Sequence, residues 1–251
     1  MELIRVTAEN IENEHICCAI SNNKDCQVAS KKAWLSERFD DGLVFLKGNV
    51  RGKCFIEYIP AEKAWVPVEA DNYTYIDCLW VAGQFKGHGY SSLLLDSCIE
   101  DSRAAGRSGL VILSARKKMP FLSDPKYLEY KGFVKADTAE PHYVLYCLPF
   151  SADADKPRFR DCVRKPLVND DGYVIYYSPQ CPYTAKYVPI LAELAARENV
   201  RLHTVLFDFA CAAQSSPSPY TAFSLFYNGR FITNEIPSEN KFMKMLEAVG
   251  R

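Results

Sequence analysis

A glycine-rich turn between an expected strand and an expected helix is the feature of this sequence best suited to chemistry. It occupies residues 81–90, with the sequence VAGQFKGHGY. Gly87 and Gly89 remove side chains where the backbone turns, so that successive N–H groups can point into one space. That space lies at a helix N-terminus, where unpaired N–H groups and the helix dipole favour a phosphate. The pattern predicts a pyrophosphate site, and the alternative is a turn that joins strand and helix without a ligand.

The spacing of this turn is neither G-x-G-x-x-G nor G-x-x-x-x-G-K-[ST], which disfavours a dinucleotide fold and a nucleotide P-loop. Gln84-x-x-Gly87-x-Gly89 instead resembles the Q/R-x-x-G-x-G/A signature of the Gcn5-related N-acetyltransferases. Further along, Lys131-Gly132-Phe133 is similar to the second motif of that family. The resemblance covers about residues 1–150. It implies an acyl-CoA N-acyltransferase fold with acetyl-CoA as the acyl donor.

The resemblance also implies roles for particular residues around the turn. The strand before the turn would line the acetyl and pantetheine arm, the turn would hold the pyrophosphate, and Ser114 would lie across the gap that admits the donor. The cofactor-binding residues implied in this way are Leu79, Trp80, Val81, Gln84, Phe85, Lys86, Gly87, His88, Gly89, Tyr90, Ser91 and Ser114. Phe121 is a further candidate for the same groove, and core packing is the alternative for it.

The reaction implied by the resemblance is direct attack of an amine on a thioester. It needs a base for the amine and a donor for the developing oxyanion, which a backbone N–H near Leu79 or Val81 would supply. Asp77 is the candidate base, because period-two alternation places it on the same strand face as these two residues. A surface or salt-bridged aspartate is the alternative for Asp77, and Glu69 is a weaker candidate base.

The leaving thiolate needs a proton, for which the family often uses a tyrosine four residues before the glycine of the Gly-Phe pair. Leu128 holds that position here, and Tyr127 and Tyr130 flank it. One step along a helix turns a side chain by about 100°, so neither tyrosine substitutes automatically. Tyr127 or water is the expected proton donor.

A single thiol marks the second half of the chain. Cys181-Pro182-Tyr183-Thr184 between an expected strand and helix resembles a thioredoxin or glutaredoxin motif that has lost its second cysteine. A helix N-terminus stabilises a thiolate, so Cys181 is a possible reactive thiol. No proline stands where that fold places its cis-proline, and we expect a structural or substrate-shaping role before a redox one. Residues 204–248, taken with the order of the two halves, resemble the YoaP-type acetyltransferases.

We expect these residues to be positioned by a mixed α/β protein that has two domains. We expect an acetyltransferase domain over residues 1–150, with a mixed α+β sheet, and a small thioredoxin-like βαβ-ββα domain over residues 157–251. The polar segment PFSADADKP at 149–157 is the expected boundary.

The expected elements follow from hydrophobic periodicity and from turn and cap residues. In the first domain strands are expected at 2–7, 43–46, 53–59, 73–81, 110–113, 133–135 and 143–148, and helices at 11–20, 31–39, 90–105 and 124–130. In the second domain strands are expected at 173–177, 205–209, 223–227 and 231–233, and helices at 185–198 and 241–249.

Composition narrows the functional classes further. The chain has 251 residues and a formal net charge of -1, which favours neither nucleic acid nor an anionic membrane as a partner. No apolar run reaches the roughly 18 residues of a membrane span. The ten cysteines form no CxxC pair, so we expect reduced thiols, no metal site and a cytoplasmic location.

Two functions from different classes therefore stand. The first is an acetyl-CoA-dependent N-acetyltransferase that acts on an unidentified amine. The second is a thiol-dependent redox or thiol-carrier protein that uses Cys181 and whose first domain only binds CoA. The intact glycine signature favours the first, and the missing second cysteine weakens the other. The sequence specifies neither the acceptor amine nor the oligomeric state.

Overall fold

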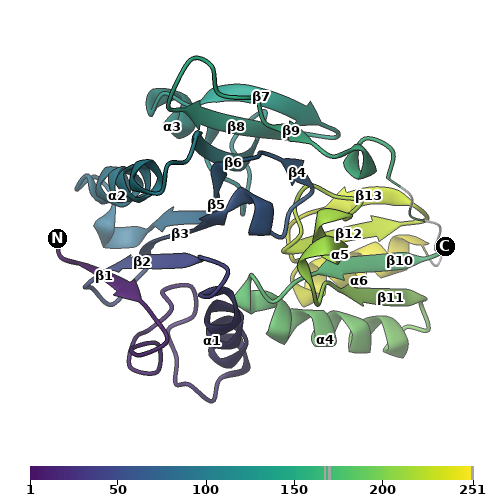
Figure 1. Ribbon diagram of the computed structural model, residues 1–251. Helices are drawn as coiled ribbons and strands as arrows, with labels where there is room; N and C mark the ends of the chain where they lie inside the picture. The colour runs from purple at the N-terminus through teal and green to yellow at the C-terminus, as the bar shows by residue number, and fades with distance from the viewer. Residues whose placement is uncertain (167, 169–170, 250–251) are drawn as a thin grey trace.

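Two β-sheets lie side by side in this protein (Figure 1). The computed structural model describes residues 1–166, 168 and 171–249. The larger sheet has seven strands in the order β1-β2-β3-β5-β6-β8-β7, and the smaller has four in the order β11-β10-β12-β13. A two-stranded ribbon, β4-β9, accompanies them. The predicted mixed α/β class with a large mixed sheet is confirmed.

The seven-stranded sheet carries the glycine turn at the end of a central strand. Its strands are β1 (Leu3–Val6), β2 (Val44–Gly48), β3 (Cys54–Pro60), β5 (Tyr73–Val81), β6 (Gly109–Ala115), β7 (Val134–Ala139) and β8 (Tyr143–Pro149). β5 and β6 pair in parallel, while the other neighbours in the sheet are antiparallel. Parallel neighbours need a crossover connection, and here the turn and the following helix supply it.

Three helices belong to the larger sheet: α1 (Cys26–Arg38), α2 (Tyr90–Ala104) and α3 (Pro125–Tyr130). The sequence explains their starts. The Asp25 carboxylate accepts from the Gln27 amide before α1, and Asp124 caps α3, with Pro125 in the first turn, as predicted. Short 3₁₀ turns stand at Ala61–Lys63, Gly83–Phe85 and Asp161–Val163.

The two faces of the larger sheet are covered by different elements. Leu94 and Cys98 of α2 and Leu128 of α3 pack with Ile56 and Ile76 in one apolar cluster. On the opposite face, α1 and residues from the second half of the chain share a second cluster with the seven strands; its members include Trp34, Phe55, Tyr75, Phe207 and Ala213. One apolar core therefore continues from the larger sheet into the second half of the chain.

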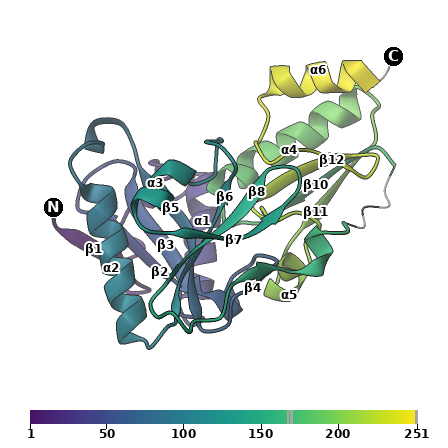
Figure 2. The same cartoon turned by 90° about the horizontal axis from the view of Figure 1, so that it is seen from above.

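The smaller sheet has the predicted order of elements. They are β10 (Tyr173–Tyr177), α4 (Pro182–Arg197), β11 (Leu202–Leu206), β12 (Phe223–Tyr227), β13 (Arg230–Thr233) and α6 (Glu239–Val249), with an additional short helix α5 (Ala210–Gln214). β10 pairs in parallel with β11 and antiparallel with β12. Seen from above, α4 and α6 lie together on one side of this sheet (Figure 2).

The segment between the two halves returns to the larger sheet. β4 (Val68–Glu69) pairs with β9 (Arg158–Phe159), and the Phe159 ring is buried in the shared core. Neither short strand is predicted by the sequence, because two residues carry no periodicity. The division at 149–157 remains an interpretation of the sequence.

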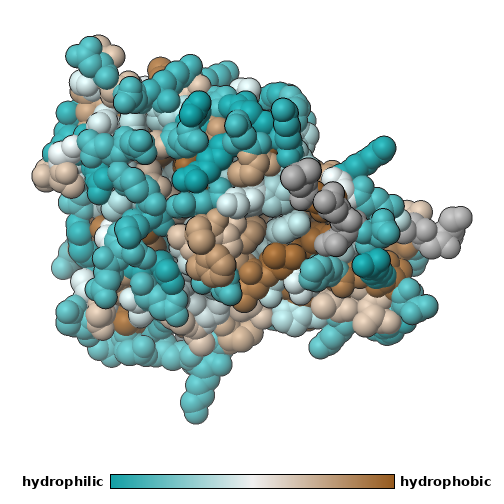
Figure 3. Space-filling view, turned by 45° about the vertical axis from the view of Figure 1, so that its right-hand side comes forward, coloured by the Kyte–Doolittle hydropathy of each residue, from teal (hydrophilic) through white to brown (hydrophobic). Residues whose placement is uncertain are grey.

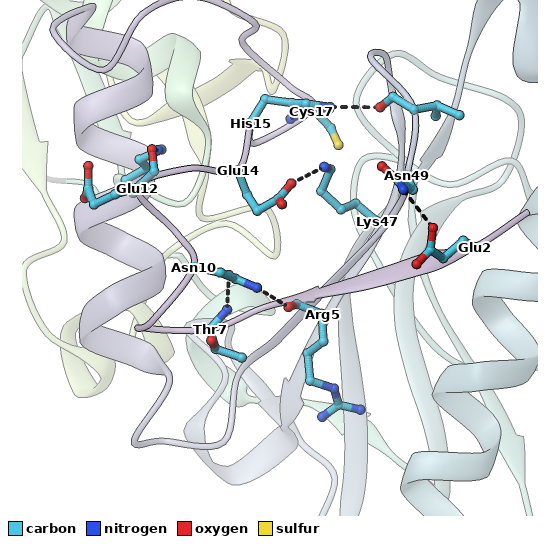
Figure 4. Close-up of polar contacts among 12 residues, drawn as sticks. Glu2, Arg5, Thr7, Asn10, Glu12, Glu14, His15, Cys17, Lys47 and Asn49 are labelled. Atoms are coloured by element: carbon cyan, nitrogen blue, oxygen red, sulfur yellow. Dashed lines mark hydrogen bonds and ion pairs between the residues drawn. The ribbon is translucent and has the colours of Figure 1, made fainter.

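Residues 11–20 do not form the predicted helix. They form turns and irregular coil, and Cys17 has a left-handed φ of 58°. Tertiary contacts explain the difference: Lys47 Nζ lies 2.5 Å from a Glu14 carboxylate oxygen, and a His15 ring nitrogen lies 2.8 Å from the Val50 carbonyl (Figure 4). Two other predictions are displaced, because α1 begins at 26 rather than 31 and β11 spans 202–206 rather than 205–209.

Most of the face drawn in Figure 3 is hydrophilic, and its hydrophobic residues gather in the central and right-hand area. Large apolar side chains on the molecular surface include Leu206 and Phe209, which are 49% and 53% exposed. Within the described residues, no helix is both long and apolar enough to cross a membrane.

A buried ion pair links α1 to β3 where they contact the second half of the chain. Lys31 Nζ lies 2.6 Å from a Glu57 carboxylate oxygen, and the two side chains are 2% and 1% exposed. Lys31 also donates to the Gln180 carbonyl at 2.7 Å, and Trp34 Nε1 donates to Glu57 at 3.2 Å. Burial alone would lower the pKa of Lys31, but Glu57, Cys18 and Asp77 raise it by more. Lys31 is therefore a charged residue at the junction of the two sheets.

We expect Glu57→Ala to lower the free energy of unfolding by about 3–5 kcal/mol, because it removes the ion-pair partner of a buried lysine. Urea unfolding followed by circular dichroism measures this. Glu37→Ala is the matched control: Glu37 pairs with Arg38 on the surface of the same region, and its loss should cost at most about 1 kcal/mol. Equal effects of the two substitutions would contradict this role for the pair.

Candidate active site

The glycine turn presents its backbone N–H groups to open space. Gly87 and Gly89 have φ of 81° and 75°, a left-handed conformation that L side chains rarely adopt. A Cβ atom built on either would meet no atom within 4 Å. Throughout the part of the chain that the structure describes, the amides of residues 87–90 donate to no other residue. These unpaired donors lie at the N-terminus of α2, and such an arrangement favours a phosphate.

The side chains of the turn have different surroundings. Lys86 and His88 are exposed, and the His88 ring stacks on Tyr90 with centroids 5.5 Å apart. The Phe85 ring packs on Gly52, where an added Cβ would come within 2.1 Å of it. Phe85 therefore anchors the turn to the β2–β3 hairpin.

A gap between β5 and β6 opens directly before this turn. Their last paired residues are Ile76 and Ile112, so residues 77–81 of β5 run on without β6. The Ala82 amide donates to the Lys53 carbonyl on the β3 side at 2.9 Å. N–H groups alternate in direction along a strand, so those of Leu79 and Val81 point into the gap. Across the gap, the Ser114 hydroxyl donates to the Ser123 carbonyl at 2.6 Å and is used by the chain itself.

A β-bulge in β5 changes the face of the sheet on which the Asp77 side chain lies. Glu57 pairs with Cys78 and Tyr58 with Ile76, which leaves Asp77 as the extra residue of β5. Ile76, Leu79 and Val81 pack on the α2 face, whereas Tyr75, Cys78 and Trp80 pack on the opposite face. The Asp77 side chain joins that opposite face, where Gln180 Nε2 donates to its Oδ1 at 2.6 Å. The expectation that Asp77 shares a face with Leu79 and Val81 is wrong, because the bulge shifts the alternation by one residue.

Asp77 lies in a cluster of charges. Glu57 and Lys31 are its charged neighbours, and Gln180 is its hydrogen-bond donor. Burial, followed by repulsion from Glu57, raises the pKa of Asp77 well above its usual range, and Lys31 and Gln180 oppose that rise only in part. A carboxyl with a raised pKa is a stronger base than an exposed aspartate, so this group is suited to accept a proton.

Asp77 borders a cavity of about 420 Å³ between the two sheets. The first half of the chain contributes residues of α1, β3, β5 and the 120–123 loop, and the second half contributes the turns at 180–183 and 219–222. Leu79 and Trp80 line the cavity as well, so it reaches the gap between β5 and β6. Phe121 lines it and is 45% exposed, with a left-handed φ of 63°. The arrangement places an internal site within reach of the strand that precedes the glycine turn.

The other residues considered for catalysis differ in burial and in their hydrogen-bond or ion-pair partners. The Tyr127 hydroxyl is buried without a hydrogen-bond partner, and burial raises the pKa of this group, which the nearby Ser91 hydroxyl opposes in part. Tyr130 is 83% exposed. Leu128 is buried in the α2-facing cluster. Glu69 forms a surface ion pair with Arg158, outside the cavity.

Cys181 does not have the properties of a reactive thiol. Its side chain is half-buried at the wall of the cavity, and burial raises its pKa although the backbone amides of Tyr183 and Thr184 and the Lys31 charge lower it. The expected effect of the helix N-terminus is present, but burial outweighs it. Thr184, in the place of a second cysteine, donates to the Cys181 and Ser178 carbonyls at 2.7 and 2.9 Å. The motif therefore shapes a turn at the wall of the cavity.

Three residues of the site could not be identified from the sequence. Lys31, Glu57 and Gln180 are ordinary surface residue types, and no local pattern shows that they meet. The only sequence signal for this cluster is that a lysine of α1 and a glutamate of β3 stand at core-facing positions. The position of Gln180 depends entirely on how the second sheet packs on the first.

Comparisons with known proteins identify the families that the two parts of this chain resemble. The model of the acetyltransferase (GNAT) family matches residues 8–118, and the YoaP-like model matches residues 202–244. The uncharacterized N-acetyltransferase YoaP of Bacillus subtilis (strain 168) is 42% identical over 248 residues, which cover 98% of this chain and 99% of the relative.

Solved structures are more distant. A GNAT family acetyltransferase from Brucella melitensis in complex with acetyl-CoA is 16% identical, with a TM-score of 0.38, and the match covers 62% of this chain and 91% of that one. A ribosomal-protein-alanine N-acetyltransferase from the same organism is 16% identical, with a TM-score of 0.41, over 60% of this chain and 100% of that one.

We expect brief iodoacetamide treatment to label Cys26 and Cys211 first and Cys181 at least tenfold more slowly. The first two are exposed, whereas the third is half-buried and its raised pKa favours the less reactive thiol form. Mass spectrometry of the digested protein measures the order, and labelling in urea provides the control in which all three react. Labelling of Cys181 as fast as Cys26 in the folded protein would contradict its lower reactivity.

Proposed function

This chain belongs to the acetyltransferase (GNAT) family, in which its relative of 42% identity spans nearly its whole length, and we propose that it transfers the acetyl group of acetyl-CoA to an amine held between its two sheets. As a member of that family it is an N-acetyltransferase. The observation that carries the proposal is the continuity of three features: the open turn amides, the gap beside β5, and the cavity at Asp77.

The turn is the donor site in this proposal. The unpaired amides of residues 87–90 and the start of α2 suit a pyrophosphate, and the gap between β5 and β6 suits a narrow acyl-pantetheine arm. The N–H groups of Leu79 and Val81 face that gap and can donate to the oxygen on which negative charge develops. Ser91 lies at the start of α2, beside this path. Ser114 contributes backbone to the opposite wall, because its hydroxyl is occupied.

Asp77 is the proposed base. It accepts the proton that the attacking amine loses as the new C–N bond forms and the C–S bond breaks. Its second carboxylate oxygen, Oδ2, makes no hydrogen bond among the described residues and remains available on the cavity side. The buried Tyr127 hydroxyl is the proposed proton donor to the departing thiolate, on the α2 side of the gap.

The thiol-based alternative has no such support. A redox or carrier role needs an accessible thiolate, and Cys181 is only half-buried but has a raised pKa. We therefore assign the second sheet to the wall of the acceptor site.

We expect Gly89→Val to weaken acetyl-CoA binding at least about tenfold. A β-branched residue is strained at a φ of 75°, so the turn must change shape and its amides lose their common direction. Isothermal titration calorimetry with acetyl-CoA measures the affinity.

Gly106→Val is the matched control for this experiment. Gly106 has a φ of 68°, and a Cβ there also meets no atom within 4 Å, but it lies at the opposite end of α2. It should bear a similar conformational strain and retain acetyl-CoA affinity. Unchanged affinity in a folded Gly89→Val protein would remove the turn from the donor site.

We expect kcat/KM to rise with pH through the pKa of Asp77, at a midpoint above the ordinary carboxyl range. The protonated carboxyl cannot accept the amine proton, so the acid side of the profile is the inactive side. Asp77→Asn should remove this rising limb and lower kcat/KM by roughly 10²–10⁴-fold, with acetyl-CoA affinity retained. A steady-state assay of released CoA thiol over pH measures both. Full activity of Asp77→Asn at every pH would show that Asp77 is not the base.

A further inference from the structure

The charges that line the cavity do not cancel when Asp77 is ionised, and this imbalance bears on the acceptor. One cation, Lys31, and two carboxylates, Glu57 and Asp77, line it among the described residues. Lys31 is engaged by Glu57 at 2.6 Å and by the Gln180 carbonyl at 2.7 Å. Gln180 reaches Asp77 only as a neutral amide, at 2.6 Å. An ionised Asp77 therefore leaves one unpaired negative charge, and a single cationic group would complete the cluster.

The rest of the cavity wall is largely apolar and aromatic. Tyr75, Trp80 and Phe121 come from the first half of the chain, and Tyr220 comes from the second. Leu113, Leu122 and Val66 fill the spaces between them. Such walls bind an apolar body through burial, and rings through edge or face contacts. With a volume of about 420 Å³, the cavity has the size of a small-molecule site.

We propose that the acceptor is a small primary amine with one positive charge and an apolar, ring-sized body, selected jointly by the two sheets. This inference rests on the proposed function and specifies its acceptor. Asp77 attracts the ammonium group, which loses one proton to water before it attacks. Asp77 then takes the proton that the neutral amine gives up as the C–N bond forms. Gln180 positions Asp77, and Tyr220 closes the aromatic wall. The second half of the chain thus determines the choice of acceptor.

Other amine classes fit these walls less well. An amino acid carries a carboxylate, which would meet Asp77 and Glu57 and find the one lining cation, Lys31, already paired. A polyamine brings further cations to an apolar wall and towards Lys31. Lys53 stands behind Trp80, with Nζ 4.1 Å from the ring centroid, and adds to that repulsion. A lysine side chain of a protein has the charge but lacks the ring-sized body.

The test compares acceptors directly. Release of CoA thiol from acetyl-CoA is measured with phenethylamine, ethylamine, phenylalanine, spermidine and a lysine-containing peptide, and acetyl-CoA binding is measured separately by calorimetry. We expect kcat/KM for phenethylamine to exceed each of the other values by at least about tenfold. A preference for phenylalanine, spermidine or the peptide would overturn the acceptor class and leave the proposed function standing. Absence of acetyl-CoA binding would overturn the proposed function and this inference with it.

Substitution of Tyr220, in the turn before β12 of the smaller sheet, supplies an independent readout. Tyr220→Ala should lower kcat/KM for phenethylamine at least about tenfold and change that for ethylamine less than about twofold, because ethylamine has no ring to place against this wall. Tyr220→Leu, which keeps the wall filled, should fold normally and give an intermediate loss. An equal loss for both amines in Tyr220→Leu, or no loss for either, would show that the second sheet does not select the acceptor.

Discussion

A buried lysine held by one carboxylate, with a second carboxylate beside it, is the interaction on which this structure depends. Lys31 on α1, Glu57 on β3 and Asp77 on β5 come from one helix and two strands of the first half of the chain. Lys31 also donates to the Gln180 carbonyl of the second half. Burying charge is costly unless it is paired, so this cluster is stable only while these elements remain packed together. The same cluster leaves one carboxylate available at a cavity, which joins the stability of the junction to the proposed chemistry.

A local defect in β5 supports both parts of the proposed site. The extra residue at Asp77 turns its carboxyl to the cavity, while the strand parts from β6 after Ile76. The bulge against β3 and the end of pairing with β6 therefore stand at neighbouring residues of one strand. In our proposal the unpaired N–H groups of β5 and the carboxyl of Asp77 lie on opposite sides of the transferred group.

Local patterns were enough to predict several elements and the glycine turn. The strand at 73–81, the N-cap at Asp124 and the order of elements around Cys181 follow from alternation, capping and turn residues, and the structure has them. The face of Asp77 could not be predicted, because a bulge is set by the partner strand. The burial of Cys181 and the approach of Gln180 to Asp77 depend on packing between halves more than 100 residues apart in sequence. Residues 11–20 were expected to be helical, and contacts with Lys47 and Val50 hold them otherwise.

In the proposed mechanism the donor turn and the acceptor cavity meet beside Asp77. A crystal structure of the protein with bound CoA tests this meeting most directly. We expect the pyrophosphate on the amides of residues 87–90 and the thiol in the gap between β5 and β6, facing the cavity next to Asp77. A CoA molecule bound away from the glycine turn, or with its thiol directed to the surface far from Asp77, would contradict the account.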